Sequence, residues 1–272
     1  MSTEKEMSFL DHLEELRWHL IRAVVAVGVC TIVAFVSKEI VFGMLILGPS
    51  RTDFLTYQLL CQLSEITCID QLPFIIQSRK ITGQFTMHIA ASVTVGLIVA
   101  FPYVFWEIWR FIKPGLYATE QRVASGATFF VSLLFLTGVL FGYFIITPLS
   151  INFLSNYQVD PSVMNEFDIT SYVGTVTMLT LSCGLMFQLP MVVLFLSKAG
   201  LVSPQLMRQF RRHALVAILF VAALLTPPDV VSQFLISIPL VLLYEISIQI
   251  SHRVWKNREK ELRRMGLMPD ET

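Results

Sequence analysis

Long uncharged hydrophobic runs alternate with short polar segments along most of this chain. An apolar run of about 18 or more residues is long enough to cross a bilayer as a helix. The pattern predicts six membrane-spanning helices, the last two of them short, over residues 20–37, 85–105, 123–146, 169–197, 213–226 and 230–250. It therefore indicates an all-α, polytopic integral membrane protein with one membrane domain over residues 1–272.

A shorter amphipathic helix is predicted just before the first span, over residues 8–20. Its leucines recur at spacings of three and four and so share one helix face: Leu10, Leu13, Leu16 and Leu20. Asp11 and Glu15 lie one turn apart, on the same side as Trp18 and His19, and present carboxylates at the membrane surface. The spacing alone is also typical of an ordinary charged flank before a membrane helix.

The last two hydrophobic runs are joined by a tight turn, Thr226-Pro227-Pro228-Asp229. The run before this turn is too short to cross a hydrocarbon core of about 30 Å as a helix. The pair is therefore either a re-entrant hairpin or two helices that cross where the bilayer is thinned. Asp229 follows two prolines and suits the N-cap of the last helix.

Lys and Arg collect on one side of the predicted topology, which orients it by the positive-inside rule. The tail over residues 251–272 is basic, and most other basic residues fall on the same side. We therefore predict six spans with both ends in the cytoplasm. The composition agrees with a membrane protein, because 54% of the residues are hydrophobic, only 15% are charged, and the mean hydropathy is +0.66. The net charge of zero gives no indication of a nucleic-acid partner.

The sequence carries no enzyme signature. Its 5 histidines are scattered without metal-ligand spacing, and it contains no phosphate-binding loop and no nucleophile elbow. We expect no catalysis, no metal and no cofactor. Cys61 and Cys68 both fall in the longest polar connection, where an oxidising compartment would allow them to form a disulfide; the alternative is two unpaired thiols.

Three polar residues in the spans or at their ends are candidates for function, because polar groups in a bilayer are costly. They are Glu107, Glu245 and Gln188. Both glutamates lie near the predicted cytoplasmic ends of their spans, and we favour ordinary headgroup positions, with Glu107 beside Arg110 and Glu245 beside Arg253. Gln188 lies deeper.

Pro190 is expected to kink the fourth span and to free a backbone carbonyl near Gln188. Two interpretations of Gln188 are open: it bonds that carbonyl, or it lines a polar cavity.

Five segments together resemble the TatC family, whose members are the multispanning subunits of the twin-arginine protein translocase. They are residues 12–17 (HLEELR), 111–117 (FIKPGLY), 120–122 (EQR), 187–190 (FQLP) and 225–233 (LTPPDVVSQ). The resemblance covers nearly the whole chain in the same order and implies the six-helix plan. It also implies a place in the cytoplasmic (inner) membrane and export driven by the proton-motive force.

The resemblance implies a receptor for signal peptides that carry an adjacent pair of arginines on folded cargo. Glu15 and Glu120 match the family's signal-binding acids, and Leu16, Arg17 and Phe111 match positions around the same patch. The chemistry suits these residues, since two planar guanidinium groups need carboxylates that accept paired hydrogen bonds.

The resemblance also implies assembly with single-span partners of the TatA and TatB type, and a homo-oligomer within the receptor complex. Thr226 and Gln233, with Asp229 beside them, match the family's polar contact site on the last two helices. One departure is Gln188, where many members carry Glu, so no proton relay is assigned to it. Glu107 is acidic where the family often has a neutral residue.

Two other classes of function are weighed against the receptor. A secondary transporter of a small solute predicts two related halves with paired polar residues at the midplane, and no inverted repeat is visible in the sequence. A membrane scaffold that takes no part in transport predicts that export is unchanged when Glu15 or Glu120 is replaced.

Overall fold

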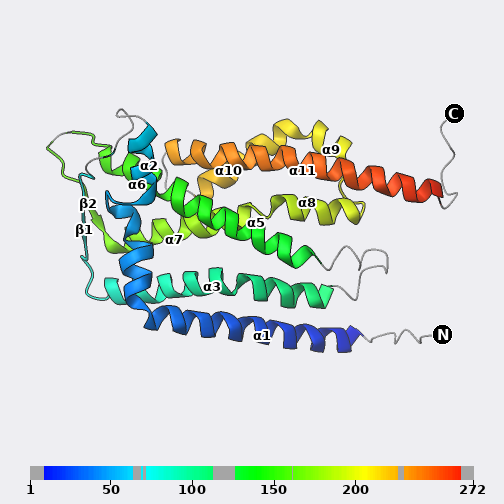
Figure 1. Cartoon of the computed structure of the whole chain (residues 1–272), viewed down its shortest axis with the longest axis horizontal. Helices are drawn as coiled ribbons and strands as arrows, with labels where there is room; N and C mark the ends of the chain where they lie inside the picture. Colours follow the sequence, from blue (N-terminus) through cyan, green and yellow to red (C-terminus); the bar gives the residue numbers. More distant parts are fainter. Residues whose placement is uncertain are drawn as a thin grey trace. The chain divides into compact units, whose positions relative to one another are not determined.

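The computed structural model describes residues 9–63, 69, 72–112, 126–160, 162–225 and 230–264. These residues are mostly helical (Figure 1). The chain divides into two compact units, which are described separately. Unit 1 comprises Met1–Arg51, Ile75–Leu136 and Glu166–Thr177, and unit 2 comprises Thr52–Phe74, Thr137–Asn165 and Met178–Thr272.

Unit 1 is built on two long antiparallel helices, α1 and α3. It also contains a short π-helix, a 3-10 turn and two short strands. The elements within it are α1 (Phe9–Val36), the π-helix η1 (Glu39–Ile46), the 3-10 turn η2 (Gly48–Ser50), β1 (Ile75–Gln77), α3 (Gly83–Ile112) and β2 (Glu166–Asp168). The helices α5 (Ala127–Phe141) and α7 (Ile169–Met186) begin in unit 1 and continue into unit 2.

The α1–α3 pair packs closely because a glycine lies at the crossing. A Cβ atom added at Gly96 would lie 2.4 Å from the Thr31 hydroxyl oxygen and 2.7 Å from the Thr31 backbone nitrogen. Only a residue without a side chain fits there. Further along, the rings of Phe35 and His88 stack with centroids 4.0 Å apart, and the His88 Nε2 atom lies 3.0 Å from the Phe35 carbonyl oxygen.

Far from the Glu107 end of α3, strands β1 and β2 pair in parallel, with Ile76 opposite Phe167. Asp168 ends β2 and accepts hydrogen bonds from the backbone N–H and hydroxyl groups of Thr170 at the start of α7. Its second oxygen accepts from the Arg79 N–H at 3.1 Å. The carboxylate therefore caps α7 and fastens the chain before α3 to it.

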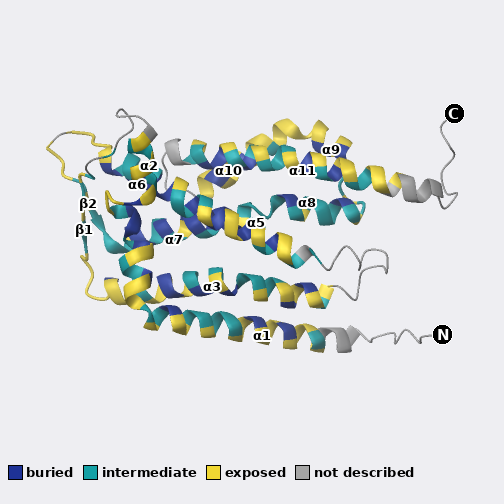
Figure 2. Cartoon of the chain, viewed as in Figure 1, coloured by how far each residue is buried: buried dark blue, intermediate teal, exposed yellow. Residues whose placement is uncertain are grey.

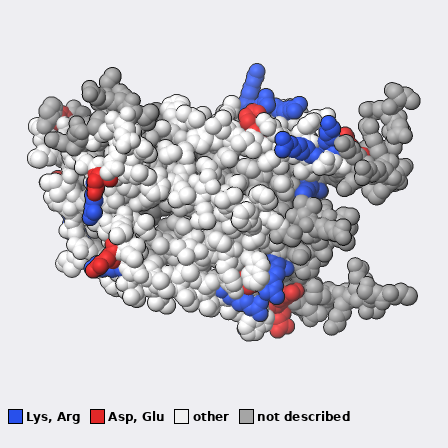
Figure 3. Space-filling model, in the orientation of Figure 1, with Lys and Arg blue, Asp and Glu red and all other residues white. Residues whose placement is uncertain are grey.

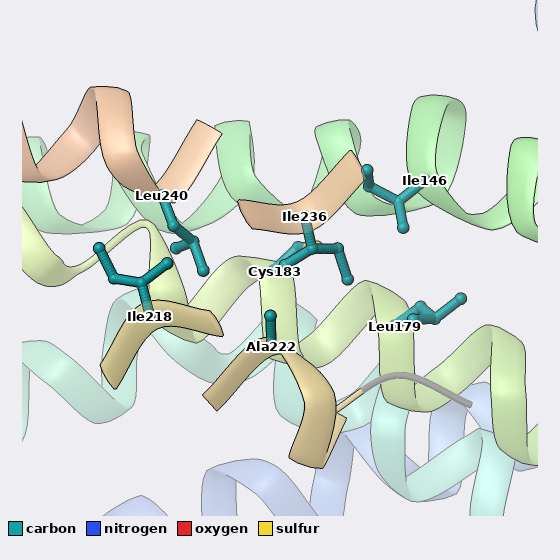
Figure 4. Packing of buried hydrophobic residues seen from close by; sticks show 7 residues of the cluster. All are labelled: Ile146, Leu179, Cys183, Ile218, Ala222, Ile236 and Leu240. Atoms are coloured by element: carbon teal, nitrogen blue, oxygen red, sulfur yellow. The ribbon is translucent and has the colours of Figure 1, made fainter. Parts of the chain in front are cut away.

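Unit 2 is a helical cluster with its own apolar core. Seven buried residues form that core, and they come from η5, α7, α10 and α11 (Figure 4): Ile146, Leu179, Cys183, Ile218, Ala222, Ile236 and Leu240. The elements of unit 2 are α2 (Leu55–Leu63), the π-helix η5 (Gly142–Ile146), α6 (Thr147–Asn156), α8 (Leu189–Lys198), α9 (Pro204–Gln209), α10 (Arg211–Leu225) and α11 (Val230–Arg264).

The wide turn η5 lets a proline lie within a continuous helical run. Pro148 has no backbone N–H and would clash with a regular α-helix, and the helix passes it through a π-turn instead. Side chains satisfy carbonyls around this turn: the Thr56 hydroxyl donates to the Phe144 carbonyl, and the buried Tyr57 hydroxyl donates to the Pro148 carbonyl at 3.0 Å. The helical run therefore continues to Asn156, beyond the predicted end at residue 146.

The interruption predicted at Pro190 is present. Helix α7 ends at Met186 and α8 begins at Leu189, with Pro190 in its first turn, where the missing N–H needs no partner. The two helices together still form one candidate span, Ile169–Lys198.

Five helices in the described part of the chain are long and apolar enough to cross a membrane. Many large apolar side chains on them are exposed (Figure 2), as a lipid-facing surface requires. In unit 1, charged side chains gather at the two ends of α1 and α3, with an uncharged length between them (Figure 3). The all-α, polytopic class is confirmed. Helix α10 has 15 residues, so a sixth crossing and the positions of the termini stay predictions.

Candidate functional site at the start of the first span

The candidate signal-binding residues on α1 lie in its first turns. Glu15 is half-buried, whereas its neighbours Glu14, Leu16 and Arg17 are exposed. The amphipathic segment and the first span form one unbroken helix from Phe9 to Val36, so these side chains have fixed positions along a single helix.

The antiparallel register places Glu15 level with Phe111. His19 contacts Glu107 across the helix pair, and one further turn on each helix leads to Glu15 on α1 and Phe111 on α3. The rings of His19 and Phe111 are 6.3 Å apart by their centroids. The two helices therefore bring together two of the residues that were predicted to form one patch.

Glu107 is buried in the α1–α3 interface, with only 1% of its surface exposed. Its Oε2 atom lies 2.5 Å from His19 Nδ1, and its Oε1 atom accepts a hydrogen bond from the Tyr103 hydroxyl at 2.9 Å. The predicted pairing with Arg110 is wrong, because the Arg110 guanidinium lies over the Trp106 ring, 5.2 Å from its centroid. A buried carboxylate needs such partners, since an unpaired charge in a low-dielectric interface is very costly.

A shallow groove of about 330 Å³ opens next to this cluster. Its lining is mostly apolar, with one cationic side chain and the Tyr103 ring, and comprises Trp18, Ile21, Arg22, Val25, Ala26 and Tyr103. The groove begins one turn beyond Glu15 on the same helix.

The other candidate acid, Glu245, lies in unit 2 and is largely accessible. It pairs with Arg211 on α10 at 2.8 Å, and both side chains are more than two-fifths exposed. The predicted neighbour Arg253 is therefore not its partner. This ion pair joins α10 to α11 across their exposed surface.

Gln233 on α11 is half-buried, and its Nε2 atom donates to the Leu219 carbonyl of α10 at 3.1 Å. It thus links the two last helices. Thr226 and Asp229, the other residues of the predicted docking site, lie outside the described residues, as do Glu120 and Cys68. Cys61 is disulfide-bonded; its pairing with Cys68 stays a prediction.

The partners of Glu107, His19 and Tyr103, are not predicted from the sequence. One signal was available: Tyr103 and Glu107 are four residues apart on one helix, a spacing at which side chains meet. His19 is 88 residues away in sequence, and no local pattern indicates that contact. Among the described residues, no group of three or more His, Cys, Asp or Glu side chains is placed to hold a metal ion.

The long apolar helices define the class of the protein, a multi-pass integral membrane protein. A family model described as "Sec-independent protein translocase protein (TatC)" matches residues 11–239. The chain belongs to the TatC family, and is thus a protein translocase component.

Relatives and solved structures that are similar to this chain match it over nearly its whole length. The Blattabacterium (Periplaneta americana, strain BPLAN) TatC protein is 38% identical over 266 residues, which are 95% of this chain and 100% of that protein. The Listeria innocua TatC protein is 33% identical, over 96% of this chain and 97% of that protein. A crystal structure of a twin-arginine translocase receptor, TatC, is 30% identical, covers 89% of this chain and 99% of its own, and has a TM-score of 0.69.

Proposed function

We propose that this chain is the receptor of the twin-arginine translocase and binds the arginine pair of signal peptides through Glu15 and Glu120. The observation that carries the proposal is that the Glu15 carboxylate has no ion-pair partner within the described residues. None of the three ion pairs within the described residues involves this half-buried carboxylate. It stands at the start of the first span, where an incoming peptide meets the membrane.

The chemistry of this carboxylate suits arginine better than lysine. A guanidinium group presents parallel N–H donors that match both oxygens of a carboxylate, whereas an ammonium group is a point charge. Each charge-assisted contact contributes about 1.5–3 kcal/mol. Two arginines would need two acids, and Glu120 supplies the second in this proposal. In this proposal Leu16, Arg17 and Phe111 contribute to the same binding patch.

The proposal is tested by measuring how tightly purified protein in detergent binds a labelled signal peptide. We expect Glu15→Gln to weaken binding about 10- to 100-fold, because the amide is uncharged and has only one acceptor oxygen, so it cannot match the two parallel N–H donors of a guanidinium. Glu14→Gln is the matched control, since it removes the adjacent, exposed charge, and it should bind as the wild type does.

A peptide with two lysines in place of the arginines completes the design. It should bind the wild type as weakly as the arginine peptide binds Glu15→Gln. If Glu14→Gln and Glu15→Gln have equal effects, only the net charge matters, and the carboxylate site is wrong.

In the same proposal the chain assembles with TatA- and TatB-type single-span subunits on α10 and α11, near Thr226, Gln233 and Asp229. The outer faces of these helices carry large exposed apolar side chains, among them Val216, Phe220, Phe234 and Ile238. A transmembrane partner would cover them, and copies of the chain would join in one receptor complex. The proposal assigns no catalytic step and no cofactor, and export draws on the proton-motive force.

A further inference from the structure

Two side chains one turn apart on α1 are natural partners for each other. Glu15 and His19 have the i, i+4 spacing, at which side chains meet on a helix surface and an imidazole N–H can donate to a carboxylate. In the structure His19 does not make this pair. Its imidazole is turned towards α3 and only 9% of the side chain is exposed.

Groups on both helices surround the His19 imidazole. From α3 it faces Glu107 and the Phe111 ring, with Tyr103 behind Glu107. From α1 its neighbours along the helix are Glu15 and Arg22. Of the two acids, only Glu107 contacts the imidazole, with its Oε2 atom 2.5 Å from His19 Nδ1 in the buried interface, where a hydrogen bond is stronger than in water.

We infer that Glu107 is a positioning residue of the twin-arginine site: it holds His19 against α3 and so leaves the Glu15 carboxylate open to a guanidinium group. This inference rests on the proposed function of Glu15. Tyr103 supports the arrangement by occupying the other oxygen of Glu107, which fixes the carboxylate in one orientation.

The consequence is competition within the protein when Glu107 is absent. A released His19 side chain can swing one turn along α1 and pair with Glu15. The peptide's arginine must then displace it. Because exposed pairs of this kind contribute up to about 1 kcal/mol, we expect Glu107→Ala to weaken binding of the arginine peptide about two- to fivefold.

The experiment compares peptide binding by Glu107→Ala, His19→Ala and the double variant H19A/E107A, each as purified full-length protein. The double variant lacks the competing imidazole, so it should bind within about twofold of the wild type. Glu107→Gln, whose amide oxygen still accepts from the imidazole, should also bind like the wild type. Thermal unfolding is recorded for every variant.

Rescue by the second substitution separates positioning from a purely structural role. A loss of packing would leave the double variant as weak as Glu107→Ala or weaker, and that result overturns the inference. Glu107→Met, similar in size but without an acceptor, replaces the alanine variant if the latter does not fold.

The controls distinguish this inference from the proposed function. If Glu15→Gln weakens binding and Glu107→Ala does not, the receptor proposal stands and the role of Glu107 is wrong. If the wild type binds arginine and lysine peptides equally, the receptor proposal fails and the inference fails with it.

Discussion

At the scale of single residues, three glutamates on α1, α3 and α11 have three different environments. Glu107 is sealed between two helices, Glu245 forms a largely accessible ion pair, and Glu15 makes no ion pair within the described residues. Removing one partner of a buried pair costs about 3–5 kcal/mol, whereas an exposed pair contributes about 1 kcal/mol or less. Burial, which the residue type does not reveal, therefore decides what each acid does.

Asp168 gives a prediction for low pH. The hydroxyl and N–H groups of Thr170, and then the Arg79 N–H, lower the pKa of this carboxyl below its ordinary value. Its contribution to stability is therefore present at neutral pH and is lost as the pH falls below about 4 towards the lowered pKa.

The measurement is the unfolding temperature of wild type and Asp168→Asn between pH 7 and pH 3. We expect the variant to unfold at a lower temperature at pH 7, and the difference to shrink in the acidic range. A difference that stays constant down to pH 3 would show that the ionised carboxylate is not what stabilises the start of α7.

The sequence allowed part of the site to be predicted. Helical spacing placed Glu15, Leu16 and Arg17 on one rigid helix, and the structure brings Phe111 level with them. The partner of Glu107 was predicted from a neighbour in sequence, Arg110, and is wrong. The true partner comes from another helix, and only the packing of α1 on α3 determines it.

At the scale of elements, the closeness of α1 and α3 depends on Gly96. An added methyl group would meet Thr31 backbone atoms at 2.7 and 2.8 Å, which forces the helices apart. We expect Gly96→Ala to lower stability by about 1–3 kcal/mol.

Gly28 on α1 is the matched control for this substitution. A Cβ atom added there meets nothing within 4 Å, so Gly28→Ala should raise stability by about 0.5–1 kcal/mol through helix propensity. Thermal or denaturant unfolding of both variants checks the prediction. Equal effects at the two positions would contradict the close packing.

Helical spans were predictable because apolar runs of this length have few alternatives in a bilayer. The π-turns were not, because they depend on how neighbouring side chains satisfy displaced carbonyls. The sequence pattern predicts that a span ends before Pro148. Instead, Thr56 and Tyr57 from α2 bond the carbonyls around it, and the helix continues.

At the scale of the whole molecule, the proposed assembly predicts a role for Gln233 beyond the α10–α11 link. A polar contact in lipid contributes about 0.6–2 kcal/mol. We therefore expect Gln233→Leu to lower the affinity for a TatA- or TatB-type subunit about three- to thirtyfold, measured by co-purification at graded partner concentrations.

Gln249→Leu, an exposed glutamine further along the same helix, is the control for added hydrophobicity. It should leave partner binding unchanged. If both variants bind the partner equally well, the docking site does not include Gln233.

The π-turn η5 also matters for comparing chains of this kind. A π-turn holds about one residue more than an α-turn, and each residue of a helix advances the facing direction by about 100°. In a homologous chain with one residue fewer here, the turn would be ordinary α-helix. The helical segments before and after the turn would still face the same directions. An alignment without a gap between Gly142 and Ile146 would then pair each position of α6 with one that faces about 100° away around the helix axis, and would misassign some of the residues that line the interior.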